Sequence, residues 1–245
     1  MVQMLNRPQK SDLAYLYSKQ DSDLNPIIFL GGFRSDMMGT KAEFLSDLCE
    51  KQKRSYLRFD YSGHGQSEGQ FDDFVLSDWL QDVEDIIAYL QIKQPILVGS
   101  SMGGWLSLRY LQQYPEQVGA FIGIAAAPDF TRWMEEAMTP AQQKELKNQG
   151  DILVPNDYGE PYIITQKLIE DGQTHFKKDV QLDFDGKVRL LQGMKDTDVP
   201  WQTAEEIKQF FSKANVEIIY REQGNHSLSS PDDLVELEKA IQSVS

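Results

Sequence analysis

One stretch near the middle of the chain decides the fold, and it reads Pro95-Ile96-Leu97-Val98-Gly99-Ser100-Ser101-Met102-Gly103-Gly104-Trp105. Its apolar start predicts a buried strand, and the residues from Trp105 to Leu111 predict a helix. Between them lies a Gly-x-Ser-x-Gly motif that only Ser101 can centre. This context is typical of a nucleophile elbow, where a sharp turn lifts a serine hydroxyl above a sheet. Glycine and serine are also common in ordinary turns, so the rest of the chain has to support the interpretation.

The order of elements around this stretch predicts a parallel sheet. Strands are expected at 13–17, 26–30, 55–60, 95–98 and 118–127, with helices at 36–53, 74–91 and 105–114 between them. After residue 180 the pattern resumes with strands at 187–192 and 216–220 and helices at 203–214 and 232–244. Alternation of this kind indicates an α/β fold with a mostly parallel, doubly wound sheet and helices on both faces. Asp36 is expected to cap the first of these helices.

The alternation breaks at Pro128, and the segment 128–180 predicts a small inserted helical cap. Helices are expected there at 130–137, 140–148 and 161–170, without a core strand. The core then consists of residues 1–127 and 181–245. Eight cap side chains are candidates for an acyl pocket, although packing of the cap onto the core explains any single one equally well: Phe130, Trp133, Met134, Met138, Tyr158, Tyr162, Ile163 and Phe176.

A serine nucleophile needs a base, and the base needs an acid that orients it. Of the three histidines, His226 follows the last predicted strand, so its loop meets that of Ser101 at the carboxyl edge of the sheet. Asp196 follows the penultimate strand, and the order Ser, Asp, His is that of an α/β-hydrolase. Asp198 competes for the acid role, and the spacing to the following Val-Pro favours Asp196.

The oxyanion of an acyl-transfer reaction needs two preorganised N–H donors. We expect them to be the backbone amides of Met102, which follows the nucleophile, and of Phe33, in the loop after the strand at 26–30. The glycines before Phe33 are equally compatible with a simple tight turn. His64 lies in a glycine-rich loop and is expected to be structural, and His175 is expected to be a cap or surface residue.

Composition narrows the classes of partner. The formal net charge of −14 argues against nucleic acids and anionic membrane surfaces. No window is long and apolar enough for a membrane span, so no stable membrane insertion is expected. The single cysteine, Cys49, is expected to be a buried structural thiol, and with no visible targeting segment it suggests a reducing, cytoplasmic location. No metal site and no cofactor are expected, and the oligomeric state is not predicted.

Four motifs give the chain a closer resemblance. They are the segment from Phe29 to Ala42, the run Arg58–Gly63, the elbow, and Gly193–Asp196 with Val199-Pro200-Trp201. Together they resemble the α/β-hydrolase family of mitochondrial palmitoyl-protein thioesterases that also act as acyl-glucuronide esterases. The resemblance implies an α/β-hydrolase fold and a serine esterase or thioesterase with Ser101, Asp196 and His226 as its triad. It also implies a small-molecule or acylated-protein substrate.

Other functions remain open at this point. Within the same fold, a carrier-protein methyl-ester esterase and a carbon–carbon bond hydrolase also use a serine triad. Dehalogenases and epoxide hydrolases of this fold place an aspartate at the elbow, which Ser101 disfavours. A non-catalytic ligand-binding protein of the same fold is the alternative from another class, and the presence of all three candidate triad residues argues against it.

Overall fold

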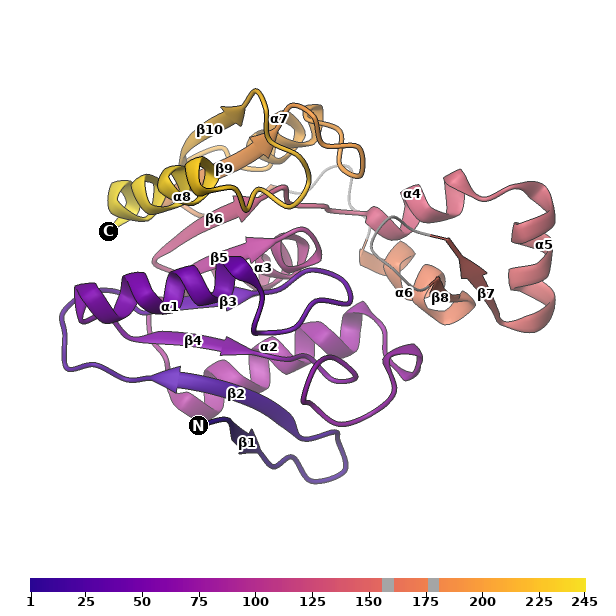
Figure 1. Cartoon of the computed structure of the whole chain (residues 1–245), viewed down its shortest axis with the longest axis horizontal. Coiled ribbons are helices and arrows are strands. Elements are labelled where there is room, and N and C mark those ends of the chain that lie inside the picture. The colour runs from indigo at the N-terminus through magenta and orange to yellow at the C-terminus, as the bar shows by residue number, and fades with distance from the viewer. Residues whose placement is uncertain (156–160, 176–180) are drawn as a thin grey trace.

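A computed structural model describes residues 1–155, 161–175 and 181–245. In these residues the core is an eight-stranded sheet of order β1-β2-β4-β3-β5-β6-β9-β10 (Figure 1). The strands are β1 Gln3–Leu5, β2 Leu13–Ser18, β3 Ile27–Leu30, β4 Tyr56–Phe59, β5 Ile96–Ser100, β6 Ala120–Ile124, β9 Lys187–Gly193 and β10 Asn215–Arg221. All neighbours from β4 to β10 pair in parallel, whereas β1 and β2 add an antiparallel edge. The predicted α/β-hydrolase type of sheet is therefore confirmed.

Helices cover both faces of the sheet because the side chains of its buried strands alternate between two apolar clusters. Ile27 and Phe29 of β3 join the cluster packed under α1 (Thr40–Gln52) and α8 (Pro231–Val244). Ile28 and Leu30 join the opposite cluster, under α2 (Leu76–Leu90), α3 (Met102–Gln113) and α7 (Gln202–Gln209). Strands that are buried on both faces are typical of parallel sheets. Two short 3₁₀ helices, Phe71–Asp73 and Pro115–Gln117, precede α2 and follow α3.

The elements between β6 and β9 lie together beside one end of the sheet, on the right in Figure 1. They are α4 Phe130–Ala137, α5 Pro140–Gln149, β7 Asp151–Val154, β8 Tyr162–Thr165 and α6 Gln166–His175. Asp171 of α6 accepts hydrogen bonds from the N–H (2.9 Å) and the hydroxyl (2.6 Å) of Ser77 in α2, which ties this group to the core. We propose that residues 128–180 form a cap.

Several details of the predicted secondary structure are wrong. The helix expected at 161–170 begins only at Gln166, because the preceding residues pair as β8 with β7. Asp36 does not cap α1, which begins after Gly39, and its carboxylate instead accepts the N–H of Met38 at 2.8 Å. The helix α7 ends at Gln209 rather than at residue 214, and β1 was not expected. Across the described part of the chain, no helix has the length and apolar character needed to cross a membrane.

Candidate active site

Ser101 lies in the sharp turn between β5 and α3, with φ 53° and ψ −116°. Four backbone hydrogen bonds hold this strained geometry. The Ser101 N–H donates to Ile124 O (2.9 Å), and Ser101 O accepts from Gly104 (2.9 Å), Trp105 (3.3 Å) and Ala127 (3.1 Å). The flanking glycines are a steric requirement. A Cβ at Gly103 would lie 2.0 Å from Leu30 O, and one at Gly99 would lie 2.4 Å from Gly103 O. The turn therefore has the geometry of a nucleophile elbow.

The structure brings the three candidate triad residues together from three loops. Ser101 Oγ lies 3.1 Å from His226 Nε2, and His226 Nδ1 lies 2.9 Å from Asp196 Oδ2. Because an ionised carboxylate only accepts hydrogen bonds, Nδ1 carries the proton and Nε2 is left to accept the proton of the serine hydroxyl. The Asp196 side chain is fully buried, and its Oδ1 accepts the backbone N–H groups of Asp198 and Val199 at 2.9 Å each. These bonds fix the carboxylate in the orientation that holds the imidazole.

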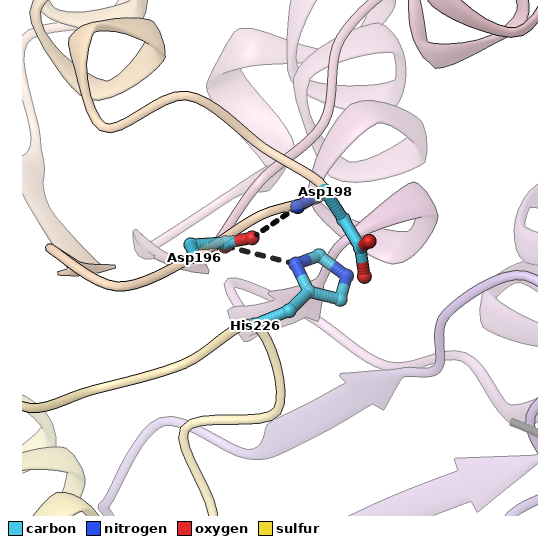
Figure 2. A group of neighbouring side chains, drawn as sticks. All are labelled: Asp196, Asp198 and His226. Atoms are coloured by element: carbon cyan, nitrogen blue, oxygen red, sulfur yellow. Dashed lines mark hydrogen bonds and ion pairs between the residues drawn. The ribbon is translucent and has the colours of Figure 1, made fainter. Parts of the chain in front are cut away.

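Asp198, the other candidate acid, is exposed at the edge of the same site (Figure 2). One carboxylate oxygen of Asp198, one of Asp196 and one ring nitrogen of His226 lie within 4.8 Å of one another. This group is the place among the described residues where side chains could hold a metal ion. The 2.9 Å bond already pairs Asp196 with His226 Nδ1, so the arrangement fits a hydrogen-bonded acid and base.

The segment after β3 passes directly beside Ser101. A Cβ placed on Gly32 would lie 3.4 Å from Ser101 Cβ. The N–H of Ser35 donates to Gly32 O at 3.1 Å and closes a turn that has Phe33 at its centre. The Phe33 N–H is not used by that bond. Met102 is the first residue of α3, so its N–H belongs to the helix's unpaired N-terminal donors. Met102 follows Ser101 directly, and the loop that carries Phe33 meets Ser101 at Gly32 and lines the same cavity.

The other two histidines lie outside the triad. His64 is only 3% exposed and packs edge-on against the rings of Tyr61, Phe71 and Trp79. Burial lowers its pKa to about 4. His175 is half-buried in α6, where its Nε2 lies 2.8 Å from Ser77 Oγ at the contact with α2.

A cavity of about 710 Å³ opens over Ser101 and His226 and extends beneath the elements of the proposed cap. Of the eight cap candidates, Phe130, Trp133, Met134 and Tyr162 line it. Met138 lines a smaller cavity of about 180 Å³ that shares Met134, Ala137, Val154 and Tyr162 with the first. Ile163 is not among the residues that line either cavity, and Tyr158 and Phe176 lie outside the described residues.

Two cationic side chains that the sequence interpretation missed also line the large cavity, Arg34 and Lys41. The Lys41 ammonium donates to Ser227 O at 2.5 Å, one residue after the catalytic candidate His226. Burial lowers the pKa of Lys41 to about 8. Arg34 places its guanidinium 4.4 Å from the centre of the Phe71 ring. Neither residue belongs to a recognised catalytic motif. Each contacts residues far away in the sequence, so the sequence alone does not place it at the cavity.

Comparison with known proteins decides the family. Residues 25–160 match the family model described as alpha/beta hydrolase fold. The chain belongs to the α/β-hydrolase family. The mouse protein named palmitoyl-protein thioesterase ABHD10, mitochondrial, is 34% identical over 235 residues, which are 95% of this chain and 78% of the mouse protein. The resemblance inferred from the four sequence motifs is thus confirmed.

Solved structures agree with this assignment. The mouse alpha/beta hydrolase domain-containing protein 10 superposes with a TM-score of 0.89 at 33% identity, covering 100% of both chains. A protein from Agrobacterium vitis S4 superposes with a TM-score of 0.93 at 35% identity, covering 100% of this α/β-hydrolase and 97% of the other chain. The prediction of an enzyme of the hydrolase class is confirmed.

The prediction of a cytoplasmic protein is wrong by the same comparison. The relatives from mouse, cattle, orangutan, human and rat are all named as mitochondrial proteins. The cytoplasmic prediction relied on the lack of a visible targeting segment and on a lone cysteine, which is buried in α1. A free thiol indicates a reducing compartment and does not distinguish one such compartment from another.

Proposed function

We propose that this α/β-hydrolase is a serine hydrolase that cleaves ester or thioester bonds of acyl substrates through an acyl-enzyme on Ser101. The observation that carries the proposal is the continuous hydrogen-bonded line from Ser101 Oγ through His226 to the buried Asp196 carboxylate. Nucleophile, base and orienting acid within hydrogen-bond distance are the arrangement that nucleophilic acyl transfer requires.

The reaction has two halves. His226 Nε2 takes the Ser101 proton as Oγ attacks the acyl carbonyl carbon, and the Met102 and Phe33 amides hold the negative oxygen that results. His226 then gives the proton to the departing thiol or alcohol, which leaves the acyl group bonded to Ser101. In the second half His226 deprotonates a water molecule that attacks the same carbonyl. His226 then returns this proton to Ser101 Oγ as the bond to the acyl group breaks and the acid product leaves.

The shape and lining of the site support an acyl substrate. Phe130, Trp133 and Met134 supply an apolar wall for the cavity over Ser101, and the smaller cavity continues it beneath the hairpin of β7 and β8. Apolar walls with a few convergent polar groups are typical of small-ligand sites. The thioesterase names of the mammalian relatives point to the same bond class. We propose an acyl-bearing small molecule or acylated protein as the substrate.

The test is steady-state hydrolysis of p-nitrophenyl butyrate, p-nitrophenyl palmitate and a palmitoyl thioester by the wild type and two serine variants. Ser101→Ala should lose at least about 10³-fold in kcat, because the nucleophile is absent. Ser100→Ala is the matched control, since its hydroxyl lies one residue outside the motif register. Ser100 lines the same cavity, so this variant should lose less than about tenfold in kcat and stay far above Ser101→Ala. Hydrolysis that survives in Ser101→Ala would overturn the proposal.

A further inference from the structure

Three side chains from the loop after β4 bind the segment after β3. The Tyr61 hydroxyl donates to Gly31 O at 3.3 Å, and Asp60 Oδ1 accepts the N–H of Met37 at 2.6 Å. Between these two bonds, His64 Nε2 accepts the backbone N–H of Arg34 at 3.2 Å. The two outer bonds fix the ends of the segment, and the His64 bond falls beside Phe33, the expected oxyanion donor.

The protonation of His64 follows from its partners. A backbone N–H can only donate, so Nε2 must be without a proton in order to accept from Arg34. The ring proton is then on Nδ1, which donates to Ser62 O at 3.3 Å. The cage of Tyr61, Phe71 and Trp79 keeps water from the ring and disfavours a charged imidazolium. Geometry and surroundings therefore agree on a neutral acceptor.

The backbone at Arg34 requires such a partner. Arg34 has φ 57°, in the left-handed region that a side chain disfavours by about 1–2 kcal/mol. It is the third residue of the turn that the bond from Ser35 N–H to Gly32 O closes, and the N–H groups of Phe33 and Arg34 project from that turn. Without an acceptor for the Arg34 N–H, the peptide between these residues can rotate and the turn from Gly32 to Ser35 loosens. The preceding Gly32–Phe33 peptide, which carries the Phe33 N–H, then loses its fixed position in the turn.

We propose that His64 is a positioning residue for the hydrolysis at Ser101: by accepting the Arg34 N–H, it fixes the turn that directs the Phe33 N–H toward the oxyanion. The proposal rests on the proposed function, because only an acyl-transfer reaction at Ser101 develops charge at that place. His64 itself does not touch the reacting atoms. The alternative is that the ring only fills space between Phe71 and Trp79.

Two variants separate positioning from packing. Gln Oε1 is as many bonds from Cβ as His Nε2, so His64→Gln retains an acceptor for the Arg34 N–H. Asn is one bond shorter, so His64→Asn retains a partner only for Ser62 O. Loss of an oxyanion donor lowers kcat by about 10²–10³-fold, and a misaligned donor should lower it by about 10- to 100-fold in His64→Asn. KM should change by less than about threefold, because the oxyanion forms after binding.

The expected pattern is thus a kcat loss in His64→Asn that His64→Gln restores to within about threefold of the wild type. Equal losses of kcat in both variants would show that the ring acts only by packing and would overturn the proposal. A His64→Asn enzyme with wild-type kcat would overturn it as well. Thermal unfolding of both variants accompanies the kinetics, because Asn also fills less of the site than Gln. The kcat loss of His64→Asn should persist well below its melting temperature, and a loss seen only where the variant unfolds would overturn the proposal.

A measurement on the wild type keeps the proposal testable even if both variants unfold. In ¹⁵N NMR of the histidine rings at neutral pH, His64 should show a protonated Nδ1 and an unprotonated Nε2. A proton on Nε2 would overturn the proposal, since that nitrogen could not then accept from Arg34. The proposed function fails separately: a fluorophosphonate that does not label Ser101 in the folded wild type would remove the reaction itself, whatever the tautomer.

Discussion

Ser101, the proposed nucleophile, has an energetically unfavourable backbone conformation. Its φ of 53° and ψ of −116° lie where a residue with a Cβ is strained, and glycine adopts such values without this penalty. Ser101→Ala retains the strain, whereas Ser101→Gly relieves it. We expect the free energy of unfolding of Ser101→Gly to exceed that of Ser101→Ala by about 1 kcal/mol, although both are inactive. Urea denaturation measures the difference, and a less stable glycine variant would contradict the strain.

The two neighbouring aspartates should differ sharply in their effect on catalysis. Asp196 accepts the His226 Nδ1 proton, so Asp196→Asn would favour the wrong tautomer and lower kcat by about 10⁴-fold, as in other serine triads. Asp198 lies beside the imidazole at an exposed position, whereas Asp196 is the residue bonded to Nδ1, so Asp198→Asn should lower kcat by less than about tenfold. Rates on p-nitrophenyl butyrate measure both, and similar losses would show that the acid role is shared.

The pattern of residues predicts the candidate triad better than it predicts the side chains that position the backbone around it. Ser101, Asp196 and His226 follow strands of one sheet, so chain order was enough to bring them together. Nothing in the spacing shows that His64 reaches the N–H of Arg34, which is 30 residues away, because that contact depends on how two loops meet. The sequence interpretation of His64 as structural therefore described its burial and missed its hydrogen bond.

At the scale of elements, the end of α4 forms part of the wall between the two cavities. Ala137 is exposed and lines both, so a large side chain there should block passage into the smaller cavity. We expect Ala137→Trp to lower kcat/KM for p-nitrophenyl palmitate by about tenfold and to leave p-nitrophenyl butyrate unchanged, since the lost apolar contact is worth about 1–2 kcal/mol.

The control is Glu136→Trp, which adds the same side chain one residue earlier, at an exposed position outside both linings. It should leave both rates near those of the wild type. If Ala137→Trp changes the two esters equally, the smaller cavity does not receive the acyl chain.

Secondary structure was predictable for the strands that are buried on both faces of the sheet, because they are short apolar runs. The short apolar runs of β3, β5 and β6 agree with the predicted strands to within a few residues. The error at β8 has a physical cause. Tyr162-Ile163-Ile164-Thr165 is rich in β-branched residues, and its pairing with β7 fixes it as a strand although a helix follows without a break. The local sequence does not show which separate segments pair as strands.

At the scale of the whole molecule, the buried His64 should make the protein sensitive to acid. Its pKa is about 4 in the folded protein and near 6.5 when unfolded, so between these pH values the unfolded chain binds more protons. Stability is therefore lost as pH falls from 6.5 to 4, by up to about 3 kcal/mol.

Chemical denaturation at pH 7 and at pH 4.5 tests this, with His64→Gln as the comparison because it lacks the titrating group. The wild type should lose more unfolding free energy than the variant over this range. Equal losses would contradict a neutral, buried His64. Comparing the two proteins removes the opposite contribution of Asp129, whose pKa burial raises to about 6.

Overall architecture was the most predictable level, since one strand–turn–helix motif and the alternation around it define the sheet and its reactive edge. Location was the least predictable, because no side-chain contact encodes it.

The central claim is that Ser101 is the nucleophile. The most direct test is mass spectrometry of the wild type, Ser101→Ala and Ser100→Ala after reaction with a fluorophosphonate. The account predicts one adduct, on Ser101, in the wild type and in Ser100→Ala, and none in Ser101→Ala. An adduct on another residue, or an unlabelled wild type that still hydrolyses esters, would contradict it.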